Sequence, residues 1–169
     1  TFAQTWTILA EEDNITSAVS SHVSITVAND VPYVVYAEGT TTGATSGIAK
    51  VKKLNGAIWE QVGGDLSALA VSFTRIYSDK NGKLYVTYID NNSATTTNKL
   101  AVKTYNTTNL AWEPLIAGNE YVSALAVTLG TNPAGACNVR SSLAFDSNNV
   151  PYITYSANGV PYVMKFDGS

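Results

Sequence analysis

The sequence has little charge, few basic residues, one histidine and one cysteine. Only 14% of its 169 residues are charged, the formal net charge is −3, and the pI is near 5.0. It therefore lacks a basic surface, and neither nucleic acid nor anionic lipid is an expected partner. Because Cys137 is the single cysteine, no intrachain disulfide can form, and a buried apolar position is expected for this side chain.

Several motifs are also missing. No apolar run approaches the ~18 residues that cross a bilayer, and no signal peptide is recognisable, so no membrane insertion is expected. There is no histidine pair, Gly-rich phosphate loop or nucleophile elbow, so we expect no cofactor and no metal site, and the interpretation leans away from an enzyme. Low charge with loops rich in Ser, Thr and Asn is typical of secreted or cell-surface proteins, which is the expected location.

What the sequence does contain is a repeat. Trp6, Trp59 and Trp112 recur every 53 residues, and each heads a similar short segment. A second motif runs in step as Val-Pro-Tyr-Val-Val-Tyr, Lys-Leu-Tyr-Val-Thr-Tyr and Val-Pro-Tyr-Ile-Thr-Tyr, starting at residues 31, 83 and 150. A unit of this length cannot bury its apolar surface alone. We therefore expect one domain over residues 1–169, with repeats at about 6–58, 59–111 and 112–169 and a closing strand from residues 1–9.

Each repeat is predicted to contain four short antiparallel strands and no helix. Clusters of Asn, Asp, Ser and Gly separate the first two strands, as in β-hairpins. The predicted strand pairs are 22–27 with 31–36, 73–77 with 84–88, and 141–145 with 151–155, followed by third strands at 48–54, 100–105 and 162–166 and then by the Trp-led segment. The turns at 79–82 and 146–149 faintly resemble calcium loops but are better explained as Asx turns.

Four antiparallel strands in ~50 residues describe a β-propeller blade. The runs SSLAFDSNNVPYITYS and LAVKTYNTTNLAWEPLIAG resemble the blade repeat of bacterial secreted β-propellers, in which a Pro-Tyr-x-x-Tyr second strand accompanies a Trp-led fourth strand. The kelch Gly-Gly pair and the WD-repeat signatures are absent, and Lys80 stands where a sialidase-type Asp box needs aspartate. The resemblance covers nearly the whole chain and implies an all-β fold of about three four-stranded blades, half of a six-bladed ring.

Three blades are too few for a ring, since propellers typically have four to eight. The Trp-led segment 2–9 has no first three strands of its own, and residues 167–169 lie where the third repeat turns toward its Trp strand. Either two chains form a six-bladed homodimer, each completing a blade of the other, or the chain is part of a longer propeller. The sequence leaves both alternatives open.

The expected ligand site lies on the face with the long loops, because rigid scaffolds concentrate binding residues in loops. The alternative is that these Thr- and Gly-rich loops are only flexible connectors. The long loops run between second and third strands (37–47 and 90–98) and between fourth and first strands (11–21, 63–72 and 118–138).

The innermost strands of a propeller line its central channel. Aligning the repeats places His22, Phe73 and Arg140 in one column, and Ser24, Arg75 and Ser142 in the next. Both arginines of the chain fall in these columns, and a guanidinium suits a carboxylate or phosphate, so an acidic sugar is a candidate ligand. The alternatives are that each arginine pairs with a local Asp or with carbonyls at the channel mouth, and that His22 has a structural role. Tyr121 has no counterpart in the other repeats and is the predicted exposed aromatic of the site.

These patterns predict a non-enzymatic binding or scaffolding module with a carbohydrate or protein ligand. One alternative is a glycoside hydrolase or lyase, which would draw two carboxylates from the long loops. Another is a purely architectural repeat of a larger surface protein. The candidate carboxylates are Glu11, Glu12, Asp13, Glu38, Asp65, Asp90 and Glu120.

Overall fold

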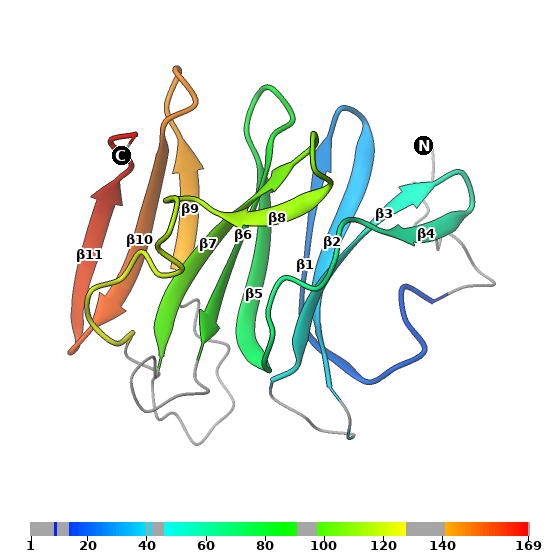
Figure 1. Ribbon diagram of the computed structural model, residues 1–169, viewed down its shortest axis with the longest axis horizontal. Helices are drawn as coiled ribbons and strands as arrows, with labels where there is room; N and C mark the ends of the chain where they lie inside the picture. Colours follow the sequence, from blue (N-terminus) through cyan, green and yellow to red (C-terminus); the bar gives the residue numbers. More distant parts are fainter. Residues whose placement is uncertain are drawn as a thin grey trace, which may run out of the picture.

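The computed structural model describes residues 9, 14–39, 41, 46–90, 98–127 and 141–168. Over these ranges the chain is all-β, with eleven strands in three antiparallel sheets and no helix (Figure 1). No helix within the described ranges is therefore long and apolar enough to cross a membrane.

Each sheet is a meander whose strands pair in chain order, and we call the sheets blades 1, 2 and 3. Among the described residues blade 3 has three strands in the order β11-β10-β9, which leaves β11 at its edge. Blade 1 contains β1 (Ser20–Ala28), β2 (Val31–Glu38), β3 (Ile48–Asn55) and β4 (Ile58–Gln61); blade 2 contains β5 (Val71–Ser78), β6 (Leu84–Asp90), β7 (Lys99–Asn106) and β8 (Ala111–Pro114); blade 3 contains β9 (Ser141–Phe145), β10 (Pro151–Ala157) and β11 (Val160–Lys165).

The turn residues explain where the strands reverse. Asn29 and Asp30 both have positive φ, as a type I′ hairpin turn requires. At the equivalent turns of blades 2 and 3, the Oδ1 atoms of Asp79 and Asp146 each accept two backbone N–H bonds at 2.8–2.9 Å. The prediction of Asx turns is thereby confirmed, and within the described ranges no cluster of His, Cys, Asp and Glu is arranged to hold a metal ion.

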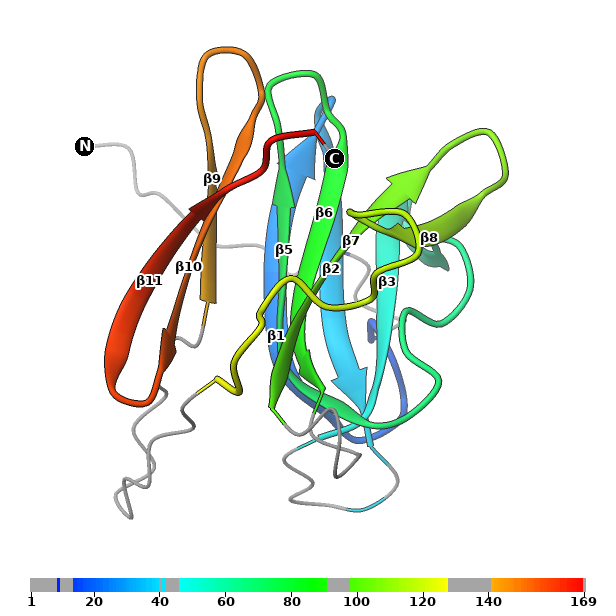
Figure 2. The same cartoon turned by 60° about the vertical axis from the view of Figure 1, so that its left-hand side comes forward.

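The blades stack face to face, with blade 2 between the other two (Figures 1 and 2). In blade 2 we call the face that carries Ile76 and Val86 the front face, and the opposite face, which carries Thr87, the back face. The equivalent faces of the other blades take the same names. The front face of blade 2 packs on the back face of blade 1, and its back face packs on the front face of blade 3. The repeated tyrosines Tyr36, Tyr88 and Tyr155 are at most 7% exposed, as expected for packing positions.

The expectation that every repeat tryptophan packs between blades is only partly correct. Trp112 in β8 is buried between blades 1 and 2, where its Nε1–H donates to the Val62 carbonyl at 2.8 Å. Trp59 in β4 is half-buried and belongs to neither core cluster. It lies on the front face of blade 1, and no described blade packs on that side. Trp6 and Cys137 lie outside the described residues.

Candidate ligand-binding site

The first strands of blades 1 and 2 lie side by side, as expected for strands that line a channel. Three cross-blade hydrogen bonds follow one another along β1 and β5: Thr74 Oγ1 donates to the His22 carbonyl, Ile76 N–H to Ser24 Oγ at 3.4 Å, and Ser78 Oγ to the Val27 carbonyl at 3.0 Å. Figure 2 shows β1 and β5 running next to each other. The long connections enter these strands at the end that carries His22 and Phe73.

His22 and Phe73 share an unusual backbone conformation. Each sits in a β-bulge, where the pairing register shifts between Ser21 and Ser24 and between Ser72 and Arg75. Their φ angles are 54° and 56°, a region that bulky side chains rarely adopt. Bulges re-aim side chains and recur next to functional sites. Here the two bulges bring the rings together, with centroids 4.7 Å apart at an angle of 47°.

Arg75 lies in β5 two residues after Phe73, further from the end of the strand that carries the long loops. It pairs with Thr87 across β6, and residues that are opposite in an antiparallel ladder share one face of the sheet. Thr87 Oγ1 is 3.1 Å from Ser141 Oγ in β9, so Arg75 belongs to the edge between blades 2 and 3. Among the described carboxylates none is within 4.0 Å of its guanidinium, so the alternative of a local ion pair is not formed with them.

The remaining predicted site residues have different surroundings. Ser24 occupies the same register position as Arg75, but its hydroxyl accepts the Ile76 N–H and so has a structural partner. Ser142 occupies that position in blade 3 and is exposed. Arg140, predicted next to Phe73 in the column, lies outside the described residues.

Tyr121 is not the exposed aromatic that was expected. It is partly buried, packs against the core between blades 1 and 2, and forms an isolated bridge with Ala101. Its hydroxyl donates to Asp90 Oδ2 at 2.5 Å. The sequence could not indicate this, because the contact depends on how the segment after β8 folds back over β7. Phe73 was in the predicted column, but nothing in the sequence indicated the bulge that places its ring beside His22.

The described loop carboxylates all have partners. Glu38 pairs with Lys50 and accepts from Thr16 Oγ1 at 2.8 Å, and the Lys50 hydrogen bond is the main cause that lowers the pKa of Glu38. Glu120 accepts from Tyr88 and lies 3.1 Å from Lys103 Nζ. Burial, and then Glu120, raise the pKa of Tyr88. Asp65 accepts from Gln61, and Asp90 accepts from Tyr121. Glu11, Glu12 and Asp13 lie outside the described residues.

Three antiparallel meanders stacked face to face, with the first strands of blades 1 and 2 adjacent, define a partial β-propeller. Comparison with solved structures agrees with this fold. An exo-β-1,3-galactanase from Phanerochaete chrysosporium solved with galactose superimposes with a TM-score of 0.52 at 14% identity, over 89% of this chain and 36% of that one. A putative exo-β-1,3-galactanase from Bifidobacterium bifidum gives 0.52 at 8% identity, over 87% and 48%. A thermostable family-43 glycoside hydrolase gives 0.51 at 17% identity, over 88% and 48%.

The chain thus spans about half or less of the solved proteins it resembles. No protein-family model and no curated protein sequence matches it significantly. At these identities the likeness shows the fold alone: the chain is an all-β partial propeller of three blades.

Proposed function

We propose that this protein is a carbohydrate-binding propeller module of a secreted or cell-surface protein, and that it binds its ligand at the long-loop end of the inner strands. One observation carries the proposal: two equivalent bulges, each with a non-glycine residue at positive φ, bring the rings of His22 and Phe73 together. Such backbone strain costs about 1–3 kcal/mol per residue and tends to persist where a site needs it.

The chemistry of this wall suits a sugar that carries an acidic group. An aromatic ring offers an apolar face to the C–H face of a pyranose, while serine hydroxyls and the imidazole offer hydrogen bonds. The guanidinium of Arg75, which no described carboxylate neutralises, can hold a carboxylate or sulfate in bidentate geometry. The carbohydrate-active names of the similar structures support this ligand class.

A glycoside hydrolase is the second candidate, because the similar structures include enzymes of that class. Glycoside hydrolysis generally needs two carboxyl groups, about 5–9.5 Å apart, on either side of the scissile bond. The inner strands β1, β5 and β9 contain no Asp or Glu, and the described loop carboxylates are engaged by Lys, Thr, Tyr or Gln side chains. Binding without turnover is therefore the proposal that these residues support better.

We further propose that the module acts within a closed ring, either as a homodimer or as part of a longer propeller chain. A protein ligand on the same face, and an architectural role within a larger surface protein, are the alternatives that a binding screen would distinguish from the carbohydrate proposal.

The test is a binding screen of the full chain against neutral and uronic-acid oligosaccharides, followed by calorimetry. Arg75→Gln should weaken binding of an acidic oligosaccharide at least about 10-fold, the effect of losing one charge-assisted interaction of ~1.5–3 kcal/mol, and should change affinity for its neutral analogue little. Phe73→Ala should weaken both. Lys83→Gln, at the opposite end of the blade, is the matched control.

If Arg75→Gln and Lys83→Gln bind an acidic ligand equally well, the inner-strand site is wrong. Product release from any oligosaccharide, abolished by Asp90→Asn or Glu120→Gln, would instead establish the hydrolase.

A further inference from the structure

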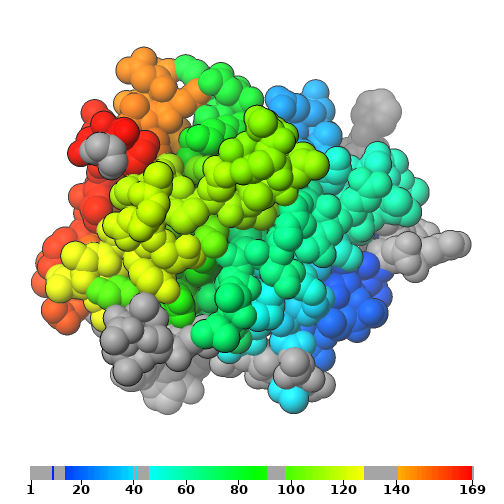
Figure 3. All heavy atoms as spheres, viewed as in Figure 1, coloured from blue at the N-terminus to red at the C-terminus, as the bar shows by residue number. Residues whose placement is uncertain are grey.

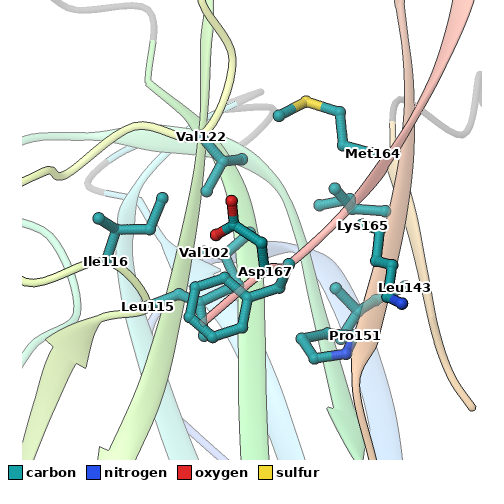
Figure 4. Close-up of a pocket in the computed structure, with 11 residues that line it drawn as sticks. Val102, Leu115, Ile116, Val122, Leu143, Pro151, Met164, Lys165 and Asp167 are labelled. Atoms are coloured by element: carbon teal, nitrogen blue, oxygen red, sulfur yellow. The ribbon is translucent and has the colours of Figure 1, made fainter. Parts of the chain in front are cut away.

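The junction of blades 2 and 3 contains an apolar pocket that the core does not fill. It has a volume of about 230 Å³. Figure 4 shows side chains from blade 2 on one side of it and side chains from blade 3 on the other. In the space-filling view the segment after β8, coloured yellow, lies beside β11, coloured red (Figure 3). Its apolar lining includes Val102, Leu115, Val122, Leu143, Pro151 and Ile153.

The same position at the junction of blades 1 and 2 is occupied by a tryptophan. The strand registers and equivalent hydrogen bonds within the blades, such as Val62 N–H to the Val51 carbonyl and Leu115 N–H to the Val102 carbonyl, show which residues of the two junctions are equivalent. There Trp112 is only 8% exposed and shares one core cluster with all six counterparts of the pocket lining. Those counterparts are, in the same order, Val51, Val62, Leu66, Ile76, Leu84 and Val86.

The contacts that hold Trp112 also have counterparts around the pocket. Trp112 Nε1–H donates to the Val62 carbonyl, and Leu115 is the residue equivalent to Val62. The ring of Tyr105 lies 5.1 Å from that of Trp112, and Phe166, which lines the pocket, is equivalent to Tyr105. The pocket therefore offers an indole the same apolar walls, a carbonyl acceptor and an aromatic neighbour. What it lacks among the described residues is a fourth strand on β11.

We infer that this pocket receives the indole of Trp6 from a second copy of the chain, whose segment 2–9 pairs with β11 as the fourth strand of blade 3. Residues 5–9 read Thr-Trp-Thr-Ile-Leu, the same kind of segment as those headed by Trp59 and Trp112. The spacing to the next blade agrees: β5 begins twelve residues after Trp59, and β1 begins fourteen residues after Trp6. Each Trp-led strand is thus the fourth strand of one blade, and the next strand along the chain begins the following blade. Trp6 therefore belongs to the blade that precedes blade 1 in the ring.

The exposed faces support a second copy as the occupant. On the front face of β1, Val23, Ile25 and Val27 are 57–62% exposed, whereas the equivalents of the first two are 2–3% exposed in β5 and 3–6% exposed in β9. Conversely, Thr154 on the back face of blade 3 is exposed, whereas its equivalent Thr87 in blade 2 is fully buried. Blade 3 of one copy thus presents the face that blade 1 of another copy needs. Two copies would close both openings in a six-bladed ring.

Closure within one chain fits the geometry poorly. The segment before β1 is held on blade 1, where Gly39 N–H donates to the Val19 carbonyl and Thr16 donates to Glu38. Five residues from Asn14 to Leu9 span at most ~18 Å, whereas blades 1 and 3 are two sheet spacings of ~10 Å apart, with blade 2 between them.

Cysteine cross-linking of the full chain tests the pairing directly. By the register of β7 with β8, Ile8 should lie opposite Met164 as Pro114 lies opposite Lys103, a separation that allows a disulfide. In a Cys137→Ser background, chains with Ile8→Cys are mixed with chains with Met164→Cys and oxidised. We expect a covalent heterodimer at about twice the 17.9 kDa chain mass. Val163→Cys, whose side chain is on the opposite face of β11, replaces Met164→Cys as the control and should not cross-link.

Sedimentation equilibrium provides the second readout. The unmodified chain should be a dimer, and Trp6→Ala should raise its dissociation constant about 100-fold or more, since truncating a buried Trp costs ~3–5 kcal/mol. Trp6→Phe should have a smaller effect, and Thr5→Ala almost none. A monomeric unmodified chain at high concentration would overturn the proposal. So would a disulfide that forms only within single chains carrying both Ile8→Cys and Met164→Cys.

Discussion

The two described tryptophans should contribute very differently to stability, although they occupy equivalent positions in the repeat. Trp112→Ala removes a side chain that is 92% buried, with its ring contact to Tyr105 and its hydrogen bond to the Val62 carbonyl. Truncation of a buried Trp typically costs ~3–5 kcal/mol. Trp112→Phe keeps most of the ring but loses the hydrogen bond and some packing, so about 1–2 kcal/mol is expected. Trp59→Ala should cost less, about 2 kcal/mol, because its side chain is only partly buried and belongs to neither core cluster.

The free energy of unfolding would be measured by urea denaturation followed by far-UV circular dichroism, which does not depend on tryptophan fluorescence. The protein concentration must be below the dissociation constant of any dimer, because assembly would bury Trp59 and add to the apparent stability. Equal losses for Trp59→Ala and Trp112→Ala under these conditions would refute the reasoning that only the second lies in a blade junction. An unchanged denaturation midpoint for Trp112→Phe would show that its indole hydrogen bond contributes nothing.

Two further predictions concern the blades themselves. The pair Glu38–Lys50 should stabilise the fold by about 0.5–1 kcal/mol at pH 7, because it is only partly exposed. Since folding lowers the pKa of Glu38, this contribution should be present above the unfolded pKa near 4.5 and be lost as the pH falls through the lower pKa of the folded state. A double-mutant cycle with Glu38→Gln and Lys50→Met at pH 7 and pH 3 would measure the loss. Gly82 and Gly56 both have positive φ, but a Cβ at Gly82 would collide with the Asn29 side chain of blade 1, whereas one at Gly56 meets nothing. Gly82→Ala should therefore cost up to ~1 kcal/mol more than Gly56→Ala in thermal unfolding, because the Asn29 side chain must move to make room, and equal costs would contradict the packing of that turn on blade 1.

The strands and turns were predictable because the same pattern of strand and turn residues recurs in each repeat. The predicted strand pairs agree with β1, β2, β5, β6, β9 and β10 to within about two residues, since Asx and type I′ turn residues mark the reversals. The clearest difference is β11, which begins at Val160 rather than at the predicted Tyr162. Asn158 and Gly159, with φ of 51° and 76°, form a tight hairpin turn between the predicted strands, so both strands extend further toward it.

For the candidate site, the sequence predicted only which residues occupy equivalent positions on the inner strands. Register confirms that Ser24, Arg75 and Ser142 occupy equivalent positions, because their partners are the equivalent residues Val35, Thr87 and Thr154. The bulges could not be predicted, since phenylalanine rarely adopts positive φ and histidine, although enriched there among non-glycine residues, does so far less readily than glycine. The partners of Tyr121 could not be predicted either, because its contacts with Ala101 and Asp90 depend on tertiary folding rather than on the repeat.

The two proposals are connected by the position of blade 3. In the proposed ring, β1 of a second copy lies beside β9 as β5 lies beside β1, so Ser142 would meet the Ile25 amide of that copy as Ser24 meets Ile76 here. One channel would then contain Arg75 from both copies. Two guanidinium groups in one channel repel each other unless an anion lies between them. An acidic ligand would therefore favour the ring over separate chains, and by linkage the ring would favour the ligand to the same degree.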